Sequence, residues 1–579
     1  MRKKIIEFKD FSFQYRVQAE PTIKNINLSI HEGEKVLIVG PSGSGKSTLA
    51  HCINGLVPFF YEGRVNGQLN INGQDATKMN IFELSKVVGT VLQDPDSQFI
   101  GLTVGEDIAF KLENYCTNQD EMIAKVDKSA ELVDIKNEIN ASPYKLSGGQ
   151  KQRVTLAGVT VDDVDILLFD EPLASLDPAT GEGAIELIDK IKKENNKTVI
   201  IIEHRLEDVL HCDVDRIIVM DKGEIVADCT MDEIIRKDVL RKVGIREPLY
   251  LTALRYAGCE INKTLKLNSE DESDILEYKD NLKSWYENIK SNEVIHYRKP
   301  ILELENINFS YNNEKQILKN VSFKIDKGDM AAIVGRNGAG KSTISKLVCG
   351  FYKPNSGKIL FDEKDMVNDT IKERSEKIGF VMQNPNQMIS KTMVYDEVAF
   401  GLKVRGIPED EIKERVYETL KICGLYGFRS WPISALSFGQ KKRVTIASIL
   451  VLNPEMIILD EPTAGQDFKH YTEIMEFLVE LNKQGVTILM VTHDMHLMLE
   501  YTNKVVVLSN GEKIADDVPA YILTNKEIIE KANLKETSLH QLALKCDIED
   551  TTNFVNKFID YDRKIRNEAK FTDYDRRVK

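Results

Sequence analysis

The amino-acid sequence contains an internal repeat, and the repeat constrains the possible folds more than any other feature. Three strings occur twice in the same order, at an offset of about 290 residues. They are GPSGSGKST at 40–48 and GRNGAGKST at 335–343, LSGGQKQRVTLA at 146–157 and LSFGQKKRVTIA at 436–447, and LLFDEP at 167–172 and IILDEP at 457–462. The chain is therefore predicted to contain two copies of one domain.

The repeat continues beyond these strings, because 244–250 and 533–539 lie at the same offset, each after a helical-looking stretch. Each half is thus expected to end in a small extension. The 579 residues are far more than the roughly 100 to 200 of a single domain. We place the predicted parts at 1–235 for the first domain, 236–299 for its extension and a linker, 300–525 for the second domain, and 526–579 for the final extension.

Two polar stretches are predicted to lie outside the domain cores. Asn268–Lys299 is rich in Asn, Ser, Glu, Asp and Lys, a composition that favours a solvated connector. Tyr561–Lys579 carries more bases than acids and is predicted to be a solvated tail, with contact to anionic lipid as the alternative.

Composition and charge favour ordinary globular domains. Hydrophobic residues make up 42% and charged residues 29% of the chain, and the formal net charge of -14 argues against a surface built for nucleic acid. The eight cysteines include no C-x-x-C pair, which predicts reduced thiols rather than zinc or iron–sulfur ligands. No apolar run reaches the roughly 18 residues of a spanning helix. We therefore expect a cytosolic chain that does not cross a membrane by itself.

The glycine-rich strings are predicted to be phosphate-binding loops. Each follows a short apolar run, at 35–39 or 330–334, and precedes an apolar-periodic stretch that begins at Ser47 or Ser342. In a strand, loop and helix context, G-x-x-x-x-G-K-[ST] lets backbone amides surround phosphates at a helix N-terminus. A chance glycine turn is the alternative, and two matches in the same context disfavour it. The candidate ATP-binding residues are Gly40, Pro41, Ser42, Gly43, Ser44, Gly45, Lys46, Ser47 and Thr48, and Gly335, Arg336, Asn337, Gly338, Ala339, Gly340, Lys341, Ser342 and Thr343.

Two residues of each loop have predicted roles at the nucleotide. Lys46 and Lys341 should reach the β- and γ-phosphates. The hydroxyl groups of Ser47 and Ser342 should bind Mg²⁺. ATP and Mg²⁺ are therefore the predicted cofactors.

Each half also has a buried-strand pattern that ends in two acids, at Ile166–Glu171 and Met456–Glu461. An acid pair at the carboxyl end of a strand lies where open α/β sheets bind ligands. The first acid, Asp170 or Asp460, suits Mg²⁺, and the second, Glu171 or Glu461, suits a base that polarises the attacking water. Alone, such a pair would be interpreted as solvated strand-end acids, but the glycine loops favour the catalytic interpretation.

The strings Leu146–Gln150 and Leu436–Gln440 distinguish between families of nucleotide-binding proteins. Alone, each could be a loop that enters a helix, because Ser is a good N-cap. Together with the other motifs, they make nearly the whole chain resemble ATP-binding cassette (ABC) ATPases. The resemblance implies an α/β fold of two tandem P-loop domains, each with a helical signature subdomain, that close head to tail around two nucleotides. The signature residues that would contact the ATP of the opposite half are Ser147, Gly149, Ser437 and Gly439.

The same resemblance implies roles for further pairs of residues. Gln93 and Gln383 resemble the Q-loop glutamines that sense Mg²⁺ and the transport partner. His204 and His493 follow apolar runs and resemble switch histidines that contact the γ-phosphate, although a lone histidine is more often structural. The remaining pairs are the D-loops at 175–177 and 465–467, and Tyr15 and Tyr311, which resemble the aromatic residue that stacks on adenine and could instead be strand core.

One residue departs from the family pattern. Phe438 replaces the first glycine of the second signature, whereas Ser437 and Gly439 are retained. Because the extra side chain would lie beside the γ-phosphate contact, we predict two active but unequal sites.

Two classes of cassette protein compete, the ATPase of a membrane transporter and a soluble tandem cassette that acts on ribosomes or DNA. The acidic chain, the near-neutral linker and the lack of zinc cysteine pairs favour the transporter. The segments at 93–99 and 383–388, the LSFGQ variant and the repeated extensions resemble energy-coupling factor (ECF) ATPases. This resemblance implies an importer of a vitamin, a vitamin precursor or a metal ion. The chain would lie at the cytoplasmic face of the membrane with an integral T component and a substrate-binding S component, and without nucleic acid.

The apolar residues after the Q-loop glutamines have two interpretations. Phe99, Ile100, Met388 and Ile389 could form grooves for the coupling helices of the T component. Alternatively, they are ordinary core residues.

Overall fold

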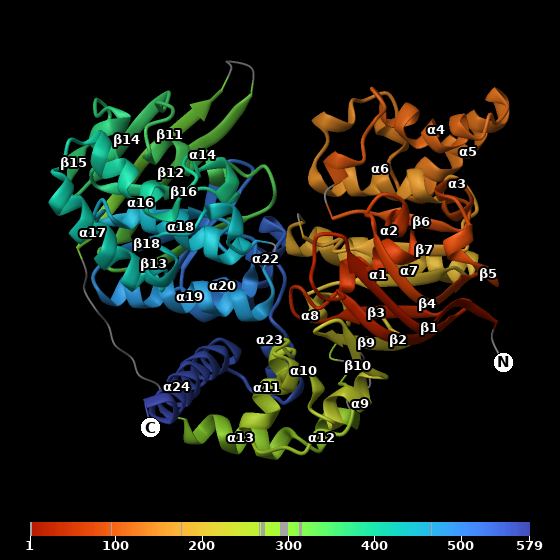
Figure 1. Cartoon of the computed structure of the whole chain (residues 1–579). Helices are drawn as coiled ribbons and strands as arrows, with labels where there is room; N and C mark the ends of the chain where they lie inside the picture. The colour runs from red at the N-terminus through yellow and green to blue at the C-terminus, as the bar shows by residue number, and fades with distance from the viewer. Residues whose placement is uncertain are drawn as a thin grey trace. The chain divides into compact units, whose positions relative to one another are not determined.

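The computed structural model describes residues 3–93, 95–174, 176–265, 267, 273–289, 299–311, 315–464 and 466–578. Two compact units are present (Figure 1). The first contains Met1–Tyr278 and Asp467–Lys469, and the second contains Lys279–Gln466 and His470–Lys579. The predicted four-part division of the chain, with its boundaries at 235, 299 and 525, stays a prediction.

The first unit contains two β-sheets among its described residues. The smaller is antiparallel, with the order β2-β1-β4-β5, and the larger has the order β10-β9-β3-β8-β7-β6 with parallel central strands. The strands of the smaller sheet are β1 (Lys4–Tyr15), β2 (Ile23–His31), β4 (Gly63–Ile71) and β5 (Gln74–Asp75). Those of the larger sheet are β3 (Lys35–Val39), β6 (Val88–Val91), β7 (Ile166–Asp170), β8 (Thr198–Ile202), β9 (Arg216–Asp221) and β10 (Glu224–Cys229).

The larger sheet is buried on both faces, which explains its continuous apolar runs. Along β3, Leu37 and Val39 belong to a core shared with the helices, whereas Val36 and Ile38 belong to a core shared with the smaller sheet. Successive side chains of a strand point to opposite faces, so one five-residue strand contributes to both cores. The helices around the first core include α4 (Val104–Asn114), α5 (Gln119–Leu132), α6 (Gly148–Thr160) and α7 (Pro178–Asn195), whereas α1 (Lys46–Ile53) packs in the core shared with the smaller sheet.

The second unit repeats this architecture. Its described strands form an antiparallel sheet β12-β11-β14-β15 and a larger sheet β16-β17-β18-β13-β19-β20. The strands are β11 (Pro300–Ser310), β12 (Gln316–Asp326), β13 (Met330–Gly335), β14 (Ser356–Phe361), β15 (Lys364–Asp365), β16 (Ile378–Val381), β17 (Met456–Asp460), β18 (Thr487–Val491), β19 (Lys504–Ser509) and β20 (Glu512–Asp517). The helices include α14 (Lys341–Val348), α16 (Val394–Val404), α17 (Glu409–Ile422), α18 (Phe438–Leu450), α19 (Phe468–Lys483) and α20 (Met495–Tyr501).

Helical extensions follow each set of sheets, as the repeat predicts. The first contains α9 (Met231–Arg236), α10 (Val239–Val243) and α11 (Leu249–Tyr256), and the second contains α21 (Pro519–Thr524), α22 (Lys526–Ala532), α23 (Ser538–Lys545) and α24 (Thr551–Val578). Gly244 ends α10 and Asn533 ends α22, both in the left-handed conformation that allows a helix to stop.

The prediction of a solvated connector at 268–299 is wrong for part of that stretch. Residues 273–289 form α12 (Ser273–Leu276) and α13 (Lys279–Asn288). Leu282 is fully buried, and the ring of Trp285 lies 6.1 Å from that of Phe554 and 5.5 Å from that of Tyr561 on α24. The polar composition concealed these helices because a few large apolar residues suffice to anchor a short amphipathic helix. The rest of the stretch, up to residue 298, lies outside the described residues.

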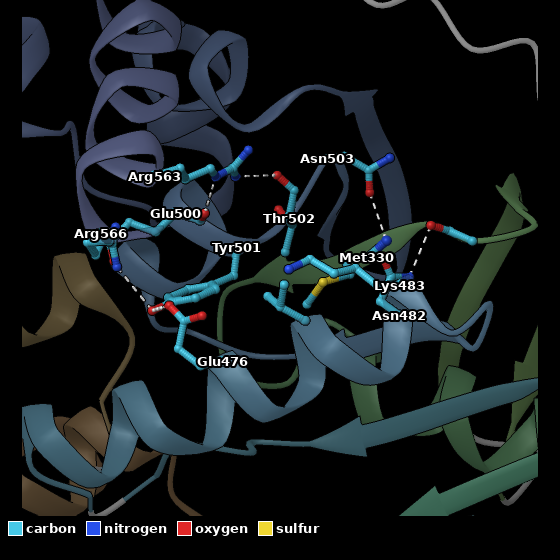
Figure 2. Close-up of a pocket in the computed structure, with 12 residues that line it drawn as sticks. Met330, Glu476, Asn482, Lys483, Glu500, Tyr501, Thr502, Asn503, Arg563 and Arg566 are labelled. Carbon is cyan, nitrogen blue, oxygen red and sulfur yellow. Dashed lines mark hydrogen bonds and ion pairs between the residues drawn. The ribbon is translucent and has the colours of Figure 1, made fainter. Parts of the chain in front are cut away.

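The prediction of a solvated tail is also wrong for Arg563 and Arg566, although Lys564 is exposed as predicted. Figure 2 shows Arg563 and Arg566 of α24 reaching the end of α20 beside a pocket of about 260 Å³. Arg563 Nε donates to the carbonyl oxygen of Glu500 at 2.7 Å, and Arg566 donates to the hydroxyl of Tyr501 at 3.1 Å. Basic residues that were expected to be solvated therefore hold α24 on the second domain.

Candidate active sites

Both glycine loops have the predicted strand, loop and helix geometry. Each helix begins at Lys46 or Lys341, one residue before the predicted Ser, because Gly45 and Gly340 act as N-caps with φ near 100°. A Cβ atom on Gly40 would lie 2.3 Å from the carbonyl oxygen of Met220, so only glycine fits there. The loop amides thus lie at a helix N-terminus, where the dipole favours phosphate.

The loop lysines take the same position in the two units. Lys46 Nζ donates to the carbonyl oxygens of Gly40 at 2.8 Å and Pro41 at 2.9 Å. Lys341 Nζ makes the corresponding bonds to Gly335 at 2.7 Å and Arg336 at 3.0 Å. Burial lowers the pKa of Lys46, and the nearby Glu171 carboxylate opposes this shift. The Lys46 ammonium group is buried, and its described hydrogen bonds go to neutral carbonyl oxygens, so it is well suited to an anionic ligand.

The acid pairs lie at the ends of β7 and β17, as predicted. Glu171 and Glu461 follow these strands with φ of 50° and 46°, a left-handed conformation that is uncommon for non-glycine residues. Their amides donate to the carbonyl oxygens of Ile202 and Val491, both at 2.9 Å. The sheet therefore fixes the backbone from which each carboxylate projects.

Each predicted catalytic glutamate contacts the predicted switch histidine of its own unit. His204 Nε2 lies 2.6 Å from Glu171 Oε1, and His493 Nε2 lies 2.9 Å from Glu461 Oε1. In the first unit, Gln93 Nε2 also donates to Glu171 Oε2 at 2.6 Å. Residues about 30 to 80 positions apart thus meet at one carboxylate.

Electrostatics separates the two acids of the first site. Burial raises the pKa of Asp170 to about 6, and the neighbouring Glu171 adds to this effect. For Glu171, burial would raise the pKa, but the bonds and charges of His204, Lys46 and Gln93 outweigh it and the net shift is downward. The Asp460 pKa is likewise raised by burial and by Glu461. Glu171 is therefore held ionised, as a base must be, while Asp170 carries a charge that its surroundings do not fully compensate.

The signature serines form helix N-caps, in agreement with the structural alternative. Ser147 accepts from the amide of Gln150 at 3.4 Å, and Ser437 accepts from that of Gln440 at 3.3 Å, each within a capping box. The ring of Phe438 is 42% exposed. Among the described contacts, none joins Ser147 or Ser437 to the phosphate loop of its own unit. Their contact with ATP stays a prediction, as do those of Gly149 and Gly439.

The two tyrosines make the same hydrogen bond in the two halves of the repeat. Tyr15 and Tyr311 each share a hydrogen bond of 3.0 Å with the threonine that ends the phosphate loop, Thr48 or Thr343. Their rings therefore lie beside the nucleotide loops, and adenine stacking stays a prediction. Of the two D-loops, Ser175 and Gly465 lie outside the described residues.

Two residues near the sites were not singled out by the sequence. Glu203 is buried behind His204, and its carboxylate accepts from the amides of Leu173 at 3.1 Å and His204 at 2.7 Å. Burial raises the Glu203 pKa. The second residue is Lys442, which is buried and occupies the position in the second half that Gln152 occupies in the first. The sequence did contain a signal for each residue. Glu203 is a charged residue at the end of an apolar strand, and Lys442 replaces Gln152 in two otherwise similar strings.

Each unit thus combines a phosphate loop, an acid pair and an imidazole at one edge of a parallel sheet, which defines a tandem P-loop nucleotide-binding protein. A family model described as ABC transporter matches residues 23–174 and 318–464, and one described as ATP-binding cassette cobalt transporter matches residues 237–309. The chain belongs to the ABC transporter family, as an ATP-binding subunit whose two domains are ATPases.

Relatives match along nearly the whole chain. A protein of Clostridium perfringens is 64% identical over 98% of this chain and 100% of its own length, and one of Enterococcus faecalis is 55% identical over the same shares. Both are named as ABC transporter ATP-binding proteins. The structure of CbiO1 from Clostridium perfringens, described as part of the ABC transporter complex CbiONQ, is 41% identical and covers 40% of this chain and 94% of that chain, with a TM-score of 0.38. In the described part of this chain, no helix is long and apolar enough to cross a membrane.

Proposed function

We propose that this chain is the ATPase subunit of an ECF importer at the cytoplasmic face of the membrane, with an integral T component and a substrate-binding S component. The observation that carries the motor role is the contact of Glu171 with His204, repeated by Glu461 with His493. Support for the ECF type comes from the LSFGQ variant, the helical extensions and the match to a cobalt transporter model over residues 237–309.

In the proposed reaction, Glu171 or Glu461 orients the water that attacks the γ-phosphate in line with the leaving group. In the first site, the lowered pKa of Glu171 keeps its carboxylate ionised, so that it can accept the water proton while His204 positions it. Lys46 and Lys341 would exchange their carbonyl partners for phosphate oxygens. By resemblance to other cassettes, the two halves close on ATP and reopen after hydrolysis, and this movement would pull on the membrane subunit.

The residues of the first site fit the proposed Mg²⁺. Asp170 Oδ1 is buried and accepts no hydrogen bond within the described residues, and a cation would compensate this orphaned oxygen. Ser47 lies close enough to lower the pKa of the same carboxyl. Mg²⁺ takes few protein ligands when phosphates and water supply the rest, and it would neutralise charge on the transferred phosphoryl group. The proposed ligands are Ser47, Gln93, Asp170, Ser342, Gln383 and Asp460.

The T component would dock on exposed apolar residues that follow the Q-loop glutamine. Ile100 is 64% exposed and Leu102 is 81% exposed, and Phe110 is also exposed on α4. Asp107 holds this loop, because its Oδ1 accepts from the amides of Ile100 at 2.8 Å and Gly101 at 3.0 Å. Phe99 is different, since it is 7% exposed and packs in the core against Tyr144. For Phe99, the core interpretation is therefore the correct one.

The second unit has a related surface. Glu397 Oε2 accepts from the amides of Ser390 at 2.8 Å and Lys391 at 2.7 Å, and Lys391 lies over the exposed ring of Phe400. Met388 is partly buried, and its sulfur accepts from the amide of Met382. Glu397 thus holds the loop after the second Q-loop glutamine, as Asp107 does in the first unit.

The proposed cargo is a vitamin, a vitamin precursor or a metal ion, and the cobalt transporter match favours cobalt within these classes. The test is to isolate the full-length chain from native membranes in detergent, identify the proteins that accompany it, and measure ATP-dependent uptake of cobalt and of vitamins in reconstituted vesicles. Recovery with two membrane proteins and uptake of one cargo would support the proposal. Recovery with ribosomes instead would overturn it and favour the soluble alternative.

A further inference from the structure

We propose that Lys442 is a positioning residue of the second active site, which holds the main chain of the Q-loop on the loop that carries Glu461. Lys442 lies on α18, five residues after the signature serine, and its side chain is 1% exposed. Complete burial of a lysine requires partners for its ammonium group. This inference rests on the proposed role of Glu461 as the base.

The partners of Lys442 are main-chain oxygens of two separate loops. Lys442 Nζ donates to the carbonyl oxygen of Gln383 at 2.6 Å and to that of Glu461 at 3.3 Å. The carbonyl oxygen of Met382 lies at 3.5 Å. One ammonium group therefore bridges the Q-loop and the catalytic loop of the same domain.

The first domain does not use this bridge. Gln152 takes the place of Lys442, and its Nε2 donates to the carbonyl oxygen of Pro172 at 2.9 Å. Its Oε1 is buried and accepts no hydrogen bond within the described residues. The Q-loop and catalytic loop of the first domain are joined instead by the side chains of Gln93 and Glu171.

The two linkages differ in whether they occupy the side chains of the Q-loop glutamine and the catalytic glutamate. In the first domain, the Gln93 amide occupies one oxygen of the catalytic carboxylate. In the second, no described bond joins the Gln383 side chain to the Glu461 carboxylate, and Lys442 holds both loops through their main chains. Charge-assisted bonds to carbonyl oxygens are stronger than neutral ones, so this bridge can fix the loops without consuming either functional side chain.

Lys442 would link a movement at the membrane partner to the catalytic glutamate. The Q-loop precedes the proposed docking residues, and a movement there would reach Glu461 through Lys442. In the first domain, the same movement would reach Glu171 through the Gln93 side chain. Lys442→Gln should therefore loosen the second Q-loop and lower turnover, with a smaller effect on nucleotide binding.

The first test is hydrogen–deuterium exchange of the full-length chain. In Lys442→Gln, the peptide at 379–389 should exchange at least about threefold faster, and the corresponding peptide at 89–99 should not change. Lys441→Gln, which removes the same charge from the adjacent position, is the matched control and should leave both peptides unchanged. Unchanged exchange at 379–389 in Lys442→Gln would overturn the bridge.

The second test is steady-state ATP hydrolysis by the chain purified with its membrane partners. Lys442→Gln should lower kcat by about two- to tenfold while KM for ATP changes by less than about twofold. Lys442→Arg, which keeps the charge and the donors, should retain most of kcat. A loss confined to KM, or an unchanged kcat, would overturn the positioning role, whereas an unaffected Glu461→Gln would instead overturn the proposed base.

A reciprocal variant gives a result even when Lys442→Gln does not fold. Gln152→Lys places the bridging side chain in the first domain, beside the same two loops. Exchange of the peptide at 89–99 should then become slower. If it stays at the wild-type rate, a lysine at this helix position does not bridge the loops, and the proposal fails.

Discussion

His204 Nε2 lies 2.6 Å from Glu171 Oε1, although the two residues follow different strands of the parallel sheet. The contact supplies the hydrogen bond and charge that outweigh burial in setting the pKa of Glu171. The contact thereby keeps the carboxylate ionised and fixes its position, which is the preorganisation that a catalytic base requires.

His204→Ala should lower kcat for ATP hydrolysis by about tenfold or more at the first site, because Glu171 loses its positioning partner. The affinity for ATP should change much less, since the phosphate loop is intact. Rates and nucleotide binding are measured on the same preparation. His211→Ala is the control, because within the described part of the chain the hydrogen bond of His211 is local, to the carbonyl oxygen of Asp208. A parallel loss of binding and rate would contradict the assigned role.

Glu171→Gln and Glu461→Gln should each reduce ATPase activity, and by different amounts. The two halves differ in three ways. Phe438 replaces a glycine in the second signature, Gln93 bonds to Glu171 in the first half, and Lys442 in the second half takes the place of Gln152 in the first. Each substitution should reduce turnover at its own site by about a hundredfold, because the amide cannot accept the water proton. Steady-state activity of the two variants compares the sites. Equal residual activities would disprove the predicted asymmetry.

Asp170→Asn should stabilise the nucleotide-free chain at neutral pH. The Asp170 pKa is raised from 3.8 to about 6, so between these values the folded state binds more protons than the unfolded state. The free energy of unfolding attributable to this group therefore falls as pH rises through that window, and the loss persists above it. At about pH 7.5 the variant should gain up to about 3 kcal/mol, and at about pH 5 clearly less. Thermal unfolding at the two pH values measures the difference, and an equal gain at both would contradict the assignment.

Much of the fold and of the sites could be predicted because their signals are local. The strand at Lys35–Val39 has the predicted bounds, and the strand predicted at Ile166–Glu171 ends one residue earlier, at Asp170, since strands buried on both faces read as continuous apolar runs. The pairing of Glu171 with His204 depends on strand order, which the sequence alone does not reveal. The resemblance to a family placed His204 at the γ-phosphate, but it did not predict the contact with Glu171.

Three features could not be predicted because their cause is tertiary packing. Phe99 follows the Q-loop within an apolar string, and only the structure separates it from the exposed Ile100. Arg563 is basic in a polar stretch, and its carbonyl partner lies 63 residues earlier. Lys442 is a charged residue that lies buried because two distant loops supply its acceptors.

Ile100→Asp and Leu102→Asp should weaken association with the membrane complex and leave ATP binding intact. Both side chains are exposed, so the added charge costs little in the isolated chain but would be buried at an apolar contact. Co-purification with the membrane subunits and nucleotide binding are the two measurements. Val226→Asp, at an exposed position on β10, is the control. Normal co-purification of both variants would exclude this surface as the docking site.

Arg563→Ala should destabilise the second unit by about 1 to 3 kcal/mol, because the carbonyl oxygen of Glu500 would lose a charged donor at 2.7 Å. Lys564→Ala, at the next position of α24, is the matched control, since that side chain is 71% exposed. The two tryptophans of the chain, Trp285 and Trp431, both belong to the second unit, so the fluorescence of urea-unfolded samples reports that unit alone. Equal midpoints for the two variants would mean that α24 is held by its apolar contacts with α13, and that the arginine contributes no net stability.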